Sequence, residues 1–316
     1  MILVGVDAGA TRVRAAAVAE GWGLLGSAAA GPANPHNVGA EPAAAEIARA
    51  IRSASSGHAP DVVVVGVAGI EVTDLRRDLQ RALQASLPGR EIHLYADAVI
   101  ALDGAFPGQP GIIVIAGTGS VAWGRNVEGH EARAGGWGHL IDDAGSGYDL
   151  SRRALGAVMR AQDGRGPSTT LTERLIAALV VDSPERVVEA VRSMGPAGIA
   201  ALAPIVVNAA AEGDRVAEEI VAEGCRELAD AAAAVARSLE LRGPHAVAGA
   251  GGLFGHATIR EAFVDALRRS SPQARFTLPR LPPVGGAVWK AFTVKGIIPD
   301  ENLLTRLEAL TGTGET

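Results

Sequence analysis

Two short turns made of glycine, alanine and threonine could hold an anion through their backbone. The first, residues 9–11, follows an apolar run that leads to Asp7, and the second, residues 117–119, follows the apolar run 112–116. Such turns leave backbone N–H groups uncovered, and a threonine in each adds a hydroxyl donor, so each can form a concavity for phosphate. Small residues also occur at hairpins simply because a tight turn favours their backbone conformations, so one such turn would be weak evidence. The presence of two such turns favours phosphate binding. The residues concerned are Gly9, Ala10, Thr11, Gly117, Thr118 and Gly119.

Only the first turn has an aspartate, Asp7, at the end of its strand. A carboxylate repels phosphate, but it can hold Mg²⁺, usually through water, and Mg²⁺ bridges the oxygens of a polyphosphate. Two phosphate turns and one metal anchor therefore predict a polyphosphate site with Mg²⁺ at Asp7. A Walker-type phosphate loop is excluded, because the only lysines, Lys290 and Lys295, lie outside any Gly-x-x-x-x-Gly-Lys sequence.

The strands that must position these turns follow the same plan twice. Runs at 2–6 and 13–18 enclose the first turn, and runs at 112–116 and 120–125 enclose the second. Each pair is followed by a further turn and a third short run. A plan repeated at this separation indicates duplication of one folding unit.

Strands alternate with helices between the two copies of this plan. Helical patterns at 41–55 and 74–87 flank a buried strand at 61–67, which predicts a partly parallel sheet covered on both faces. The other expected elements are a strand at 91–95, a helix from residue 98, helices at 148–162, 170–181, 184–193, 197–212 and 214–241, a strand at 245–248, a helix at 258–269, a strand near 275–278, a turn at 282–286 and a helix at 287–294.

The boundary between two domains is expected near residues 108–111, where proline and glycine cluster. This boundary gives an N-terminal domain over residues 1–110 and a C-terminal domain over residues 111–316. Each domain then contains one phosphate turn, and the second has additional helices.

The composition is that of an ordinary globular protein, with 316 residues, 48% hydrophobic, 20% charged and a net charge of −6. Without a basic face, a small molecule is a better default ligand than nucleic acid. No segment has the roughly 18–20 continuous apolar residues that span a bilayer, and the first residues enter a strand rather than a signal peptide. We therefore expect a cytoplasmic protein without a membrane partner. The single cysteine, Cys225, excludes an internal disulfide and cysteine-rich metal sites, and its helical surroundings indicate a small buried side chain.

Five stretches make the chain resemble a known family over residues 2 to about 292. They are similar to the N-acetylglucosamine kinase branch of the BadF/BadG/BcrA/BcrD ATPase family, within the actin–hexokinase–Hsp70 superfamily. The stretches are DAGATRVR and AGTGS for two phosphate motifs, AGAGGLF for an adenosine motif, PPVGGA near the C-terminus, and GGWGHLIDDAGSGYDLSRRALGAVMRAQDGRGPSTTL.

The resemblance implies an α/β fold of two ribonuclease-H-like, or actin-like ATPase, domains flanking a cleft for ATP and a sugar. The implied enzyme uses ATP and Mg²⁺ to phosphorylate the 6-hydroxyl of an amino sugar, N-acetylglucosamine in the first place, and acts as a homodimer. The residues implied are Gly9, Ala10, Thr11, Gly117, Thr118 and Gly119 at the phosphates, Gly251 and Gly252 at the adenosine, Asp7 at the metal, and Asn34, Asp97, Gly135, Gly136 and Asp143 at the sugar.

Two aspartates of the stretch LYADAVIALDGAF could take the proton of the sugar hydroxyl. Asp97 follows a strand directly and could also cap the helix expected from residue 98. Asp103 lies later in that helix, away from the strand ends where ligands of α/β proteins gather. The family places its catalytic aspartate at the position of Asp97, so the resemblance assigns the catalytic base to Asp97.

The chain departs from the family pattern at two places. The family often has Gly-Asp-Glu-Gly where residues 142–145 read Asp-Asp-Ala-Gly, which removes a glutamate next to the sugar hydroxyl or acyl contacts. Ala8 and Ala10 replace frequent glycines in the first turn. Trp137 could stack on a pyranose face or pack in a core, and the spacing of His36, His130 and His139 suits no metal site.

Three other activities compete with this interpretation. A kinase of glucosamine or another hexose would have the same fold and motifs. An activator ATPase of a radical dehydratase needs two cysteines per chain for its iron–sulfur cluster, and Cys225 is alone. A sugar-responsive repressor would need an N-terminal DNA-binding module, whereas this sequence starts with the phosphate strand.

Overall fold

The computed structural model describes residues 1–312 apart from residues 20, 22, 71 and 72. The chain forms two compact units: unit 1 contains Met1–Gln109 and Pro279–Thr316, and unit 2 contains Pro110–Leu278. The chain leaves unit 1 inside the range expected for the boundary. The predicted second domain, residues 111–316, extends too far. Unit 2 ends at Leu278, and the segment from Pro279 onward packs with unit 1.

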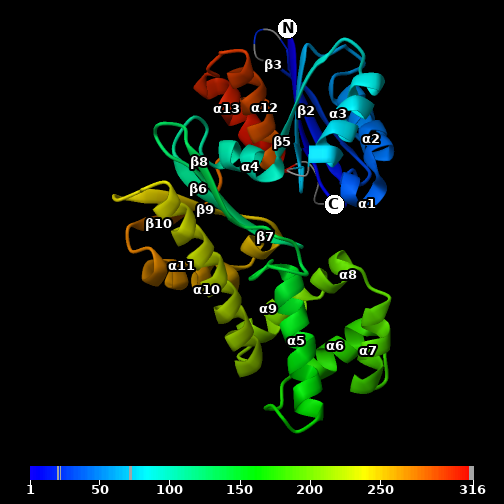
Figure 1. Cartoon of the computed structure of the whole chain (residues 1–316), viewed down its shortest axis with the longest axis vertical. Helices are drawn as coiled ribbons and strands as arrows, with labels where there is room; N and C mark the ends of the chain where they lie inside the picture. The colour runs from blue at the N-terminus through cyan, green and yellow to red at the C-terminus, as the bar shows by residue number, and fades with distance from the viewer. Residues whose placement is uncertain (20, 22, 71–72, 313–316) are drawn as a thin grey trace. The chain divides into compact units, whose positions relative to one another are not determined.

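Unit 1 is a five-stranded sheet with helices on both faces (Figure 1). Its elements are β1 (Ile2–Ala8), β2 (Val13–Ala19), β3 (Gly23–Ala30), α1 (Pro35–Val38), α2 (Ala40–Ala54), β4 (Val62–Val67), α3 (Thr73–Ser86), β5 (Glu91–Ala96), α4 (Asp97–Ala105), α12 (Pro283–Val294), α13 (Glu301–Glu308) and the 3₁₀ helix η2 (Ala309–Gly312). The strand order is β3-β2-β1-β4-β5, with β1, β2 and β3 antiparallel and β4 and β5 parallel to β1. Helices α2 and α3 cover one face, and α4, α12 and α13 cover the other.

Unit 2 repeats this sheet and adds a group of helices. Its elements are β6 (Gly111–Ala116), β7 (Ser120–Arg125), β8 (Glu131–Gly135), α5 (Gly147–Gln162), α6 (Leu171–Leu179), α7 (Pro184–Arg192), α8 (Pro196–Ala200), α9 (Ala203–Ala211), α10 (Arg215–Ser238), β9 (His245–Ala250), the 3₁₀ helix η1 (Gly252–Gly255), α11 (Ala257–Ser270) and β10 (Ala274–Thr277). The strand order is β10-β9-β6-β7-β8, with β6, β7 and β8 antiparallel and β9 and β10 following β6 in parallel. The helix expected at 197–212 is interrupted between α8 and α9.

The two sheets have the same topology, with three antiparallel strands continued by two parallel ones. The predicted duplication of one folding unit is confirmed by this order, and so is the predicted fold class. In both units the turn predicted to bind phosphate joins the first two strands, so the two turns occupy equivalent positions.

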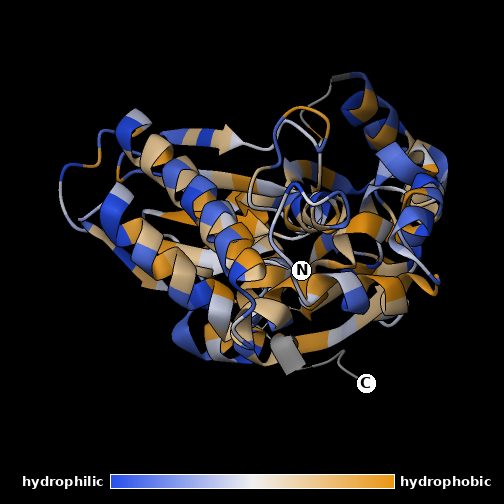
Figure 2. Ribbon diagram, turned by 90° about the horizontal axis from the view of Figure 1, so that it is seen from below, coloured by the Kyte–Doolittle hydropathy of each residue, from blue (hydrophilic) through white to orange (hydrophobic). Residues whose placement is uncertain are grey.

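Burial explains why these segments form the elements that they do. The central strands β1 and β4 are covered on both faces, and they read as nearly continuous apolar runs. Helix α2 instead buries one stripe at helical spacing, which includes Ala44, Ile47 and Ile51. Figure 2 shows the same division, with hydrophobic and hydrophilic residues on opposite sides of several helices.

The turn that the sequence predicted at 282–286 is wrong: Pro282 is the N-cap residue of α12, and residues 283–286 form the first turn of that helix. Pro283 occupies the first turn of α12, where a missing N–H costs nothing. A Cβ at Gly286 would collide with the carbonyl oxygen of Ile100 and lie 2.5 Å from the backbone nitrogen of Gly104. The glycines therefore allow α12 to pack closely against α4, which explains why the C-terminal segment belongs to unit 1.

Within the described residues, no single helix has the length and apolar character needed to cross a membrane, and one bent helix pair, Pro196–Ala211 with Arg215–Ser238, meets these criteria by length and composition alone.

Candidate active site

In unit 1, Asp7 and Asp97 lie at the same edge of the sheet. Asp7 is the penultimate residue of β1, and in the parallel register it is aligned with Gly66 of β4, which is aligned with Tyr95 of β5. Asp97 follows β5 directly as the first residue of α4. Carboxyl ends of parallel strands meet at one edge, and strands β1 and β5 are roughly 10 Å apart across β4. The two carboxylates therefore converge from two strand ends, with a residue lacking a side chain on the strand between them.

The negative charge of Asp97 contributes to the pKa of Asp7. Burial raises the pKa of Asp7 from 3.8 to about 6, the negative charge of Asp97 adds to the rise, and the guanidinium of Arg14 opposes it. A buried carboxylate whose pKa is raised further by a neighbouring carboxylate is typical of a site that binds a cation or handles a proton.

Asp97 has a different position in the helix from the one expected. Helix α4 begins at Asp97 itself, and Ala96 is the N-cap residue, without a side-chain cap hydrogen bond. The Oδ1 atom of Asp97 accepts a hydrogen bond of 2.8 Å from the N–H of Ala98. Asp103, the other candidate, is 2% exposed and forms an ion pair of 3.2 Å with Lys290 of α12. Asp103 thus joins α4 to α12, while Asp97 is at the strand edge.

The first phosphate turn is a tight connection in the backbone between β1 and β2. The N–H of Gly9 donates to the carbonyl of Arg12 at 3.0 Å, and Thr11 is exposed. The carbonyl of Gly9 accepts from the N–H of Ala33 at 3.2 Å, which places Asn34 next to this turn. The Oδ1 atom of Asn34 caps α1 by accepting from the N–H of His36 at 2.9 Å. The NH₂ group of Asn34 is not used in this cap.

In unit 2, the second phosphate turn is held by the first residues of α5. The N–H of Gly117 donates to the carbonyl of Gly119 at 2.9 Å, and the carbonyl of Gly117 accepts from the N–H of Gly147 at 2.8 Å. The carbonyl of Thr118 accepts from the N–H of Tyr148 at 3.4 Å. Thr118 itself is exposed, so its hydroxyl is accessible to a ligand at the end of β6.

Asp143 lies against this turn. A Cβ at Gly119 would be 2.9 Å from the Oδ2 atom of Asp143, so glycine is what allows the carboxylate to approach. Burial raises the pKa of Asp143, and hydrogen bonds from the backbone of Ser120 and Gly138 oppose the rise. Unit 2 therefore brings together a predicted phosphate turn and a predicted sugar contact that are 24 residues or more apart in the sequence.

The remaining predicted glycines of unit 2 lie around the same end of the sheet. Gly135 and Gly136 both have a left-handed backbone, with φ of 72° and 73°. Gly251 follows β9, the parallel neighbour of β6, and its φ is 91°. A Cβ at Gly251 would lie 2.5 Å from the carbonyl oxygen of Ala116, whereas Gly252 faces open space. Gly251 is thus required for packing, and Gly252 leaves room for a ligand.

The donor set suits a magnesium ion held by few protein atoms. The residues that the structure describes contain no cluster of three or more His, Cys, Asp or Glu side chains that could hold a metal. Mg²⁺ is commonly bound through one or two carboxylates together with phosphate oxygens and water. The Asp7–Asp97 pair, whose mutual repulsion a cation would relieve, fits this pattern.

Sequence reasoning missed one carboxylate near these residues, and it left Trp137 undecided. Asp149 of α5 is buried and contacts the turn that follows Asp143; the sequence Ser146-x-x-Asp149 is a helix-start signal that could have found it. Trp137 is 64% exposed, and the guanidinium carbon of Arg133 lies 4.5 Å from its ring centroid. Of the two alternatives for Trp137, packing in a core is therefore wrong.

The prediction for the single cysteine is confirmed, because Cys225 is buried in α10.

Comparison with known proteins gives a family match over most of the chain. The model of the BadF/BadG/BcrA/BcrD ATPase family matches residues 4–291. A curated relative from Clostridium acetobutylicum, named N-acetylmuramic acid/N-acetylglucosamine kinase, is 36% identical over 182 residues, or 57% of this chain and 60% of the relative. That match thus spans less than two thirds of the relative's length. An N-acetyl-D-glucosamine kinase from Dictyostelium discoideum is 29% identical over 257 residues, 76% of this chain and 81% of the relative.

A solved structure shares the fold. It is a protein from Chromobacterium violaceum, provisionally described as an N-acetylglucosamine kinase, with a TM-score of 0.77 and 28% sequence identity. The superposition covers 92% of this chain and 98% of the other. The fold described above is therefore shared over nearly the whole of both chains.

Proposed function

Because the chain belongs to the BadF/BadG/BcrA/BcrD ATPase family, we propose that it is an ATP-dependent kinase of an amino sugar, with N-acetylglucosamine as the preferred acceptor. The 6-hydroxyl oxygen of the sugar attacks the γ-phosphorus of ATP and forms the new P–O bond. The bond between the γ-phosphorus and the bridging oxygen breaks, and ADP leaves. The hydroxyl proton passes to a carboxylate of the protein.

The observation that carries the proposal is the pair of carboxylates at one edge of the unit 1 sheet. Asp97 is the base in this proposal: its carboxylate orients the sugar hydroxyl and takes its proton late in the transfer. Asp7 is the anchor for Mg²⁺, which would neutralise charge on the phosphates when bound. Burial, with the charge of Asp97 adding to it, raises the pKa of Asp7 to about 6 in the ligand-free protein, so a bound cation would offset an unfavourable interaction of the ionised Asp7 that is already present.

The two glycine–threonine turns supply the phosphate contacts in this proposal. Their backbone N–H groups are preorganised, so they stabilise charge on the transferring group without reorganisation. The hydroxyl of Thr118 adds a donor at the position where charge develops. The groups assigned to phosphate are those of Gly9, Ala10, Thr11, Gly117, Thr118 and Gly119, and Gly251 and Gly252 are assigned to the adenosine.

The sugar contacts come from both units in this proposal. Asn34 donates its NH₂ group and Asp97 accepts the reacting hydroxyl. Asp143 accepts from another sugar hydroxyl, and the backbone at Gly135 and Gly136 lies along the sugar. The relatives named for N-acetylglucosamine and N-acetylmuramic acid support an N-acetylated acceptor.

ADP release across a panel of sugars tests the proposal. The panel is N-acetylglucosamine, glucosamine, N-acetylmannosamine, N-acetylmuramic acid and glucose, with a reaction without sugar as the blank. We expect the highest kcat/KM with N-acetylglucosamine, and a product whose phosphate is at carbon 6 by phosphorus–proton NMR correlation. If kcat/KM is higher with glucosamine or glucose, that sugar is the preferred acceptor and N-acetylglucosamine is not. ADP release that no sugar increases would refute a sugar kinase.

A further inference from the structure

The start of helix α5 holds both the second phosphate turn and the turn that follows Asp143. The N–H groups of Gly147 and Tyr148, the first two residues of α5, donate to the carbonyls of Gly117 and Thr118 at 2.8 and 3.4 Å. The Oγ atom of Ser120, just after the phosphate turn, donates to the carbonyl of Ala144 at 2.7 Å. The two turns are thus fixed to each other and to one helix end.

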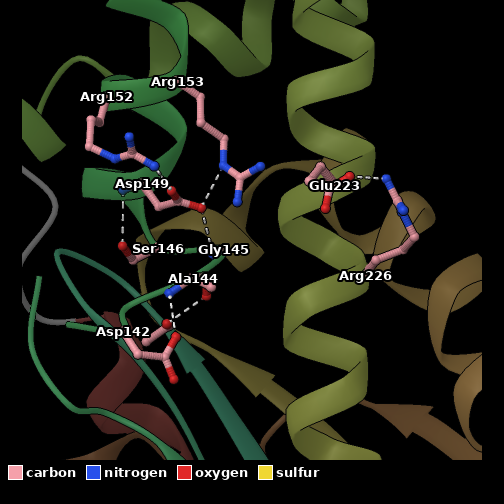
Figure 3. A network of polar contacts seen from close by, with 10 residues as sticks. Asp142, Ala144, Gly145, Ser146, Asp149, Arg152, Arg153, Glu223 and Arg226 are labelled. Atoms are coloured by element: carbon pink, nitrogen blue, oxygen red, sulfur yellow. Dashed lines mark hydrogen bonds and ion pairs between the residues drawn. The ribbon is translucent and has the colours of Figure 1, made fainter. Parts of the chain in front are cut away.

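Asp149, in the first turn of α5, is the buried carboxylate at this junction. It is 6% exposed. Its Oδ2 atom accepts a hydrogen bond of 3.1 Å from the N–H of Gly145, and its own N–H donates to the Oγ atom of Ser146 at 3.1 Å. Figure 3 shows the Asp149 side chain between the Gly145–Ser146 turn and two arginines of the same helix. Both hydrogen bonds hold the chain immediately after Asp143.

The two arginines keep the buried Asp149 carboxylate paired. Arg153 donates from Nε to Oδ2 at 2.9 Å, and Arg152 donates to Oδ1 at 3.1 Å. A buried carboxylate without such partners would be costly, whereas a paired one fixes geometry. The Asp149 side chain is thus held on both of its oxygens while it accepts from the turn.

Gly145, which donates to Asp149, has a backbone conformation and a close packing that favour glycine. Its φ is 75°, a left-handed conformation that favours glycine. A Cβ at Gly145 would collide with the carbonyl oxygen of Gly224 in α10. The N–H of Gly145 can therefore point to Asp149 only in this close-packed geometry, and Asp143 is two residues away.

We propose that Asp149 is a positioning residue that fixes the sugar contact Asp143 relative to the phosphate turn at 117–119. This proposal rests on the proposed function, since it assigns sugar and phosphate to those two segments. Loss of the Asp149 carboxylate frees the turn at 144–146 and, through the N-terminus of α5, loosens the phosphate turn. Sugar affinity and turnover then fall together, because both ligands are held by one helix end.

The test compares Asp149→Ala and Asp149→Asn with a matched control, Glu223→Gln. Glu223 also pairs with an arginine three residues later, Arg226, on a helix of the same unit, but within the described part of the chain no hydrogen bond joins it to the turn at 144–146. We expect Asp149→Ala to lose ~10- to 100-fold in kcat/KM for the sugar, as small misplacements of reacting groups do. Asp149→Asn keeps an acceptor for the N–H of Gly145 but loses both ion pairs, so we expect it to recover part of that loss. Glu223→Gln is expected to match the wild type.

Hydrogen exchange gives a second measurement that does not depend on kinase activity. In Asp149→Ala, the amide of Gly117, whose N–H donates to the carbonyl of Gly119 within the turn, should exchange several-fold faster than in Glu223→Gln, together with those of residues 145–148. If Asp149→Ala does not fold, Arg153→Gln removes one of the two ion pairs and should change exchange and kcat/KM in the same direction by a smaller factor.

The outcomes separate the two proposals. If the wild type shows no sugar-dependent ADP release, the proposed function fails, while faster exchange of the Gly117 amide in Asp149→Ala still supports the coupling of the two turns. If the wild type is active and Asp149→Ala has the kcat and KM of Glu223→Gln, the positioning role is refuted. A lowered melting temperature with exchange changes confined to 145–148 would equally refute it.

Discussion

At the scale of single residues, the pKa of Asp7 gives the ligand-free protein a distinct pH dependence. Since burial and the Asp97 charge raise this pKa from 3.8 to about 6, the folded protein binds more protons than the unfolded chain between these values. The free energy of unfolding therefore falls as the pH rises through this interval. We expect Asp7→Asn to raise the unfolding free energy at pH 7 by roughly 1–3 kcal/mol, with little change at pH 3.5, in denaturant titrations.

The exposed Asp265, which pairs with Arg268 on α11, provides the control for this experiment. Asp265→Asn should change stability little at either pH. If Asp7→Asn lowers the unfolding free energy at pH 7, the carboxylate is stabilised in the ligand-free protein and the like-charge interpretation of the pair is wrong.

Steady-state kinetics can distinguish two roles of Thr118, a contact to the transferring phosphoryl group and a contact to the sugar. Its hydroxyl is proposed to contact charge that moves onto the transferring phosphoryl group, so its contribution is largest in the transition state. We expect Thr118→Val to lower kcat about 10-fold or more and to leave the sugar KM nearly unchanged. Thr305→Val, at an exposed position of α13, serves as the control. An unchanged kcat with a raised sugar KM would instead make Thr118 a sugar contact.

At the scale of elements, the crossing of α4 and α12 depends on glycine. A Cβ at Gly286 would collide with the carbonyl of Ile100, and α4 begins with Asp97. We expect Gly286→Ala to cost about 1–3 kcal/mol or more in unfolding free energy, as overpacking does, and to lower kcat by displacing Asp97. Gly156→Ala in α5 is the matched change, because a Cβ there would have no neighbour within 4 Å among the described residues beyond the nearby backbone of its own helix. It should stabilise the protein by about 0.5–1 kcal/mol, and equal effects of the two changes on unfolding would contradict the packing argument.

The same elements indicate what the sequence could and could not predict. The strand–turn–strand repeats were predictable because a strand buried on both faces is a continuous apolar run and its turn is marked by Gly and Thr. The local sequence could not predict that residues 283–286 are helical, because Pro-Val-Gly-Gly is typical of a turn. The close contact of Gly286 with α4, which is distant in the sequence, explains the glycine there. The contact of Asp143 with Gly119 likewise depends on long-range hydrogen bonds that join residues 144–148 to residues 117–120, and not on a local pattern.

At the scale of the whole molecule, we predict that sugar binding draws the two units together. The proposed sugar contacts belong to both units, Asn34 and Asp97 to unit 1 and Asp143 to unit 2. A ligand held from both sides restrains them, and exclusion of water would prevent hydrolysis of ATP. Small-angle scattering should give a smaller radius of gyration with saturating sugar, and identical curves with and without sugar would contradict the prediction. The homodimer and the cytoplasmic location stay predictions.

The most direct test of the central claim is the rate of sugar-dependent ADP release by Asp97→Asn relative to the wild type. An asparagine keeps an oxygen that can accept from the N–H of Ala98, so the start of α4 is preserved while the base and its charge are removed. We predict a loss of at least ~100-fold in kcat, the low end for a positioned acid–base group, with binding of ATP retained and a melting temperature no lower than that of the wild type. Turnover near that of the wild type, with only the melting temperature lowered, would make Asp97 a structural residue of α4 and contradict the account.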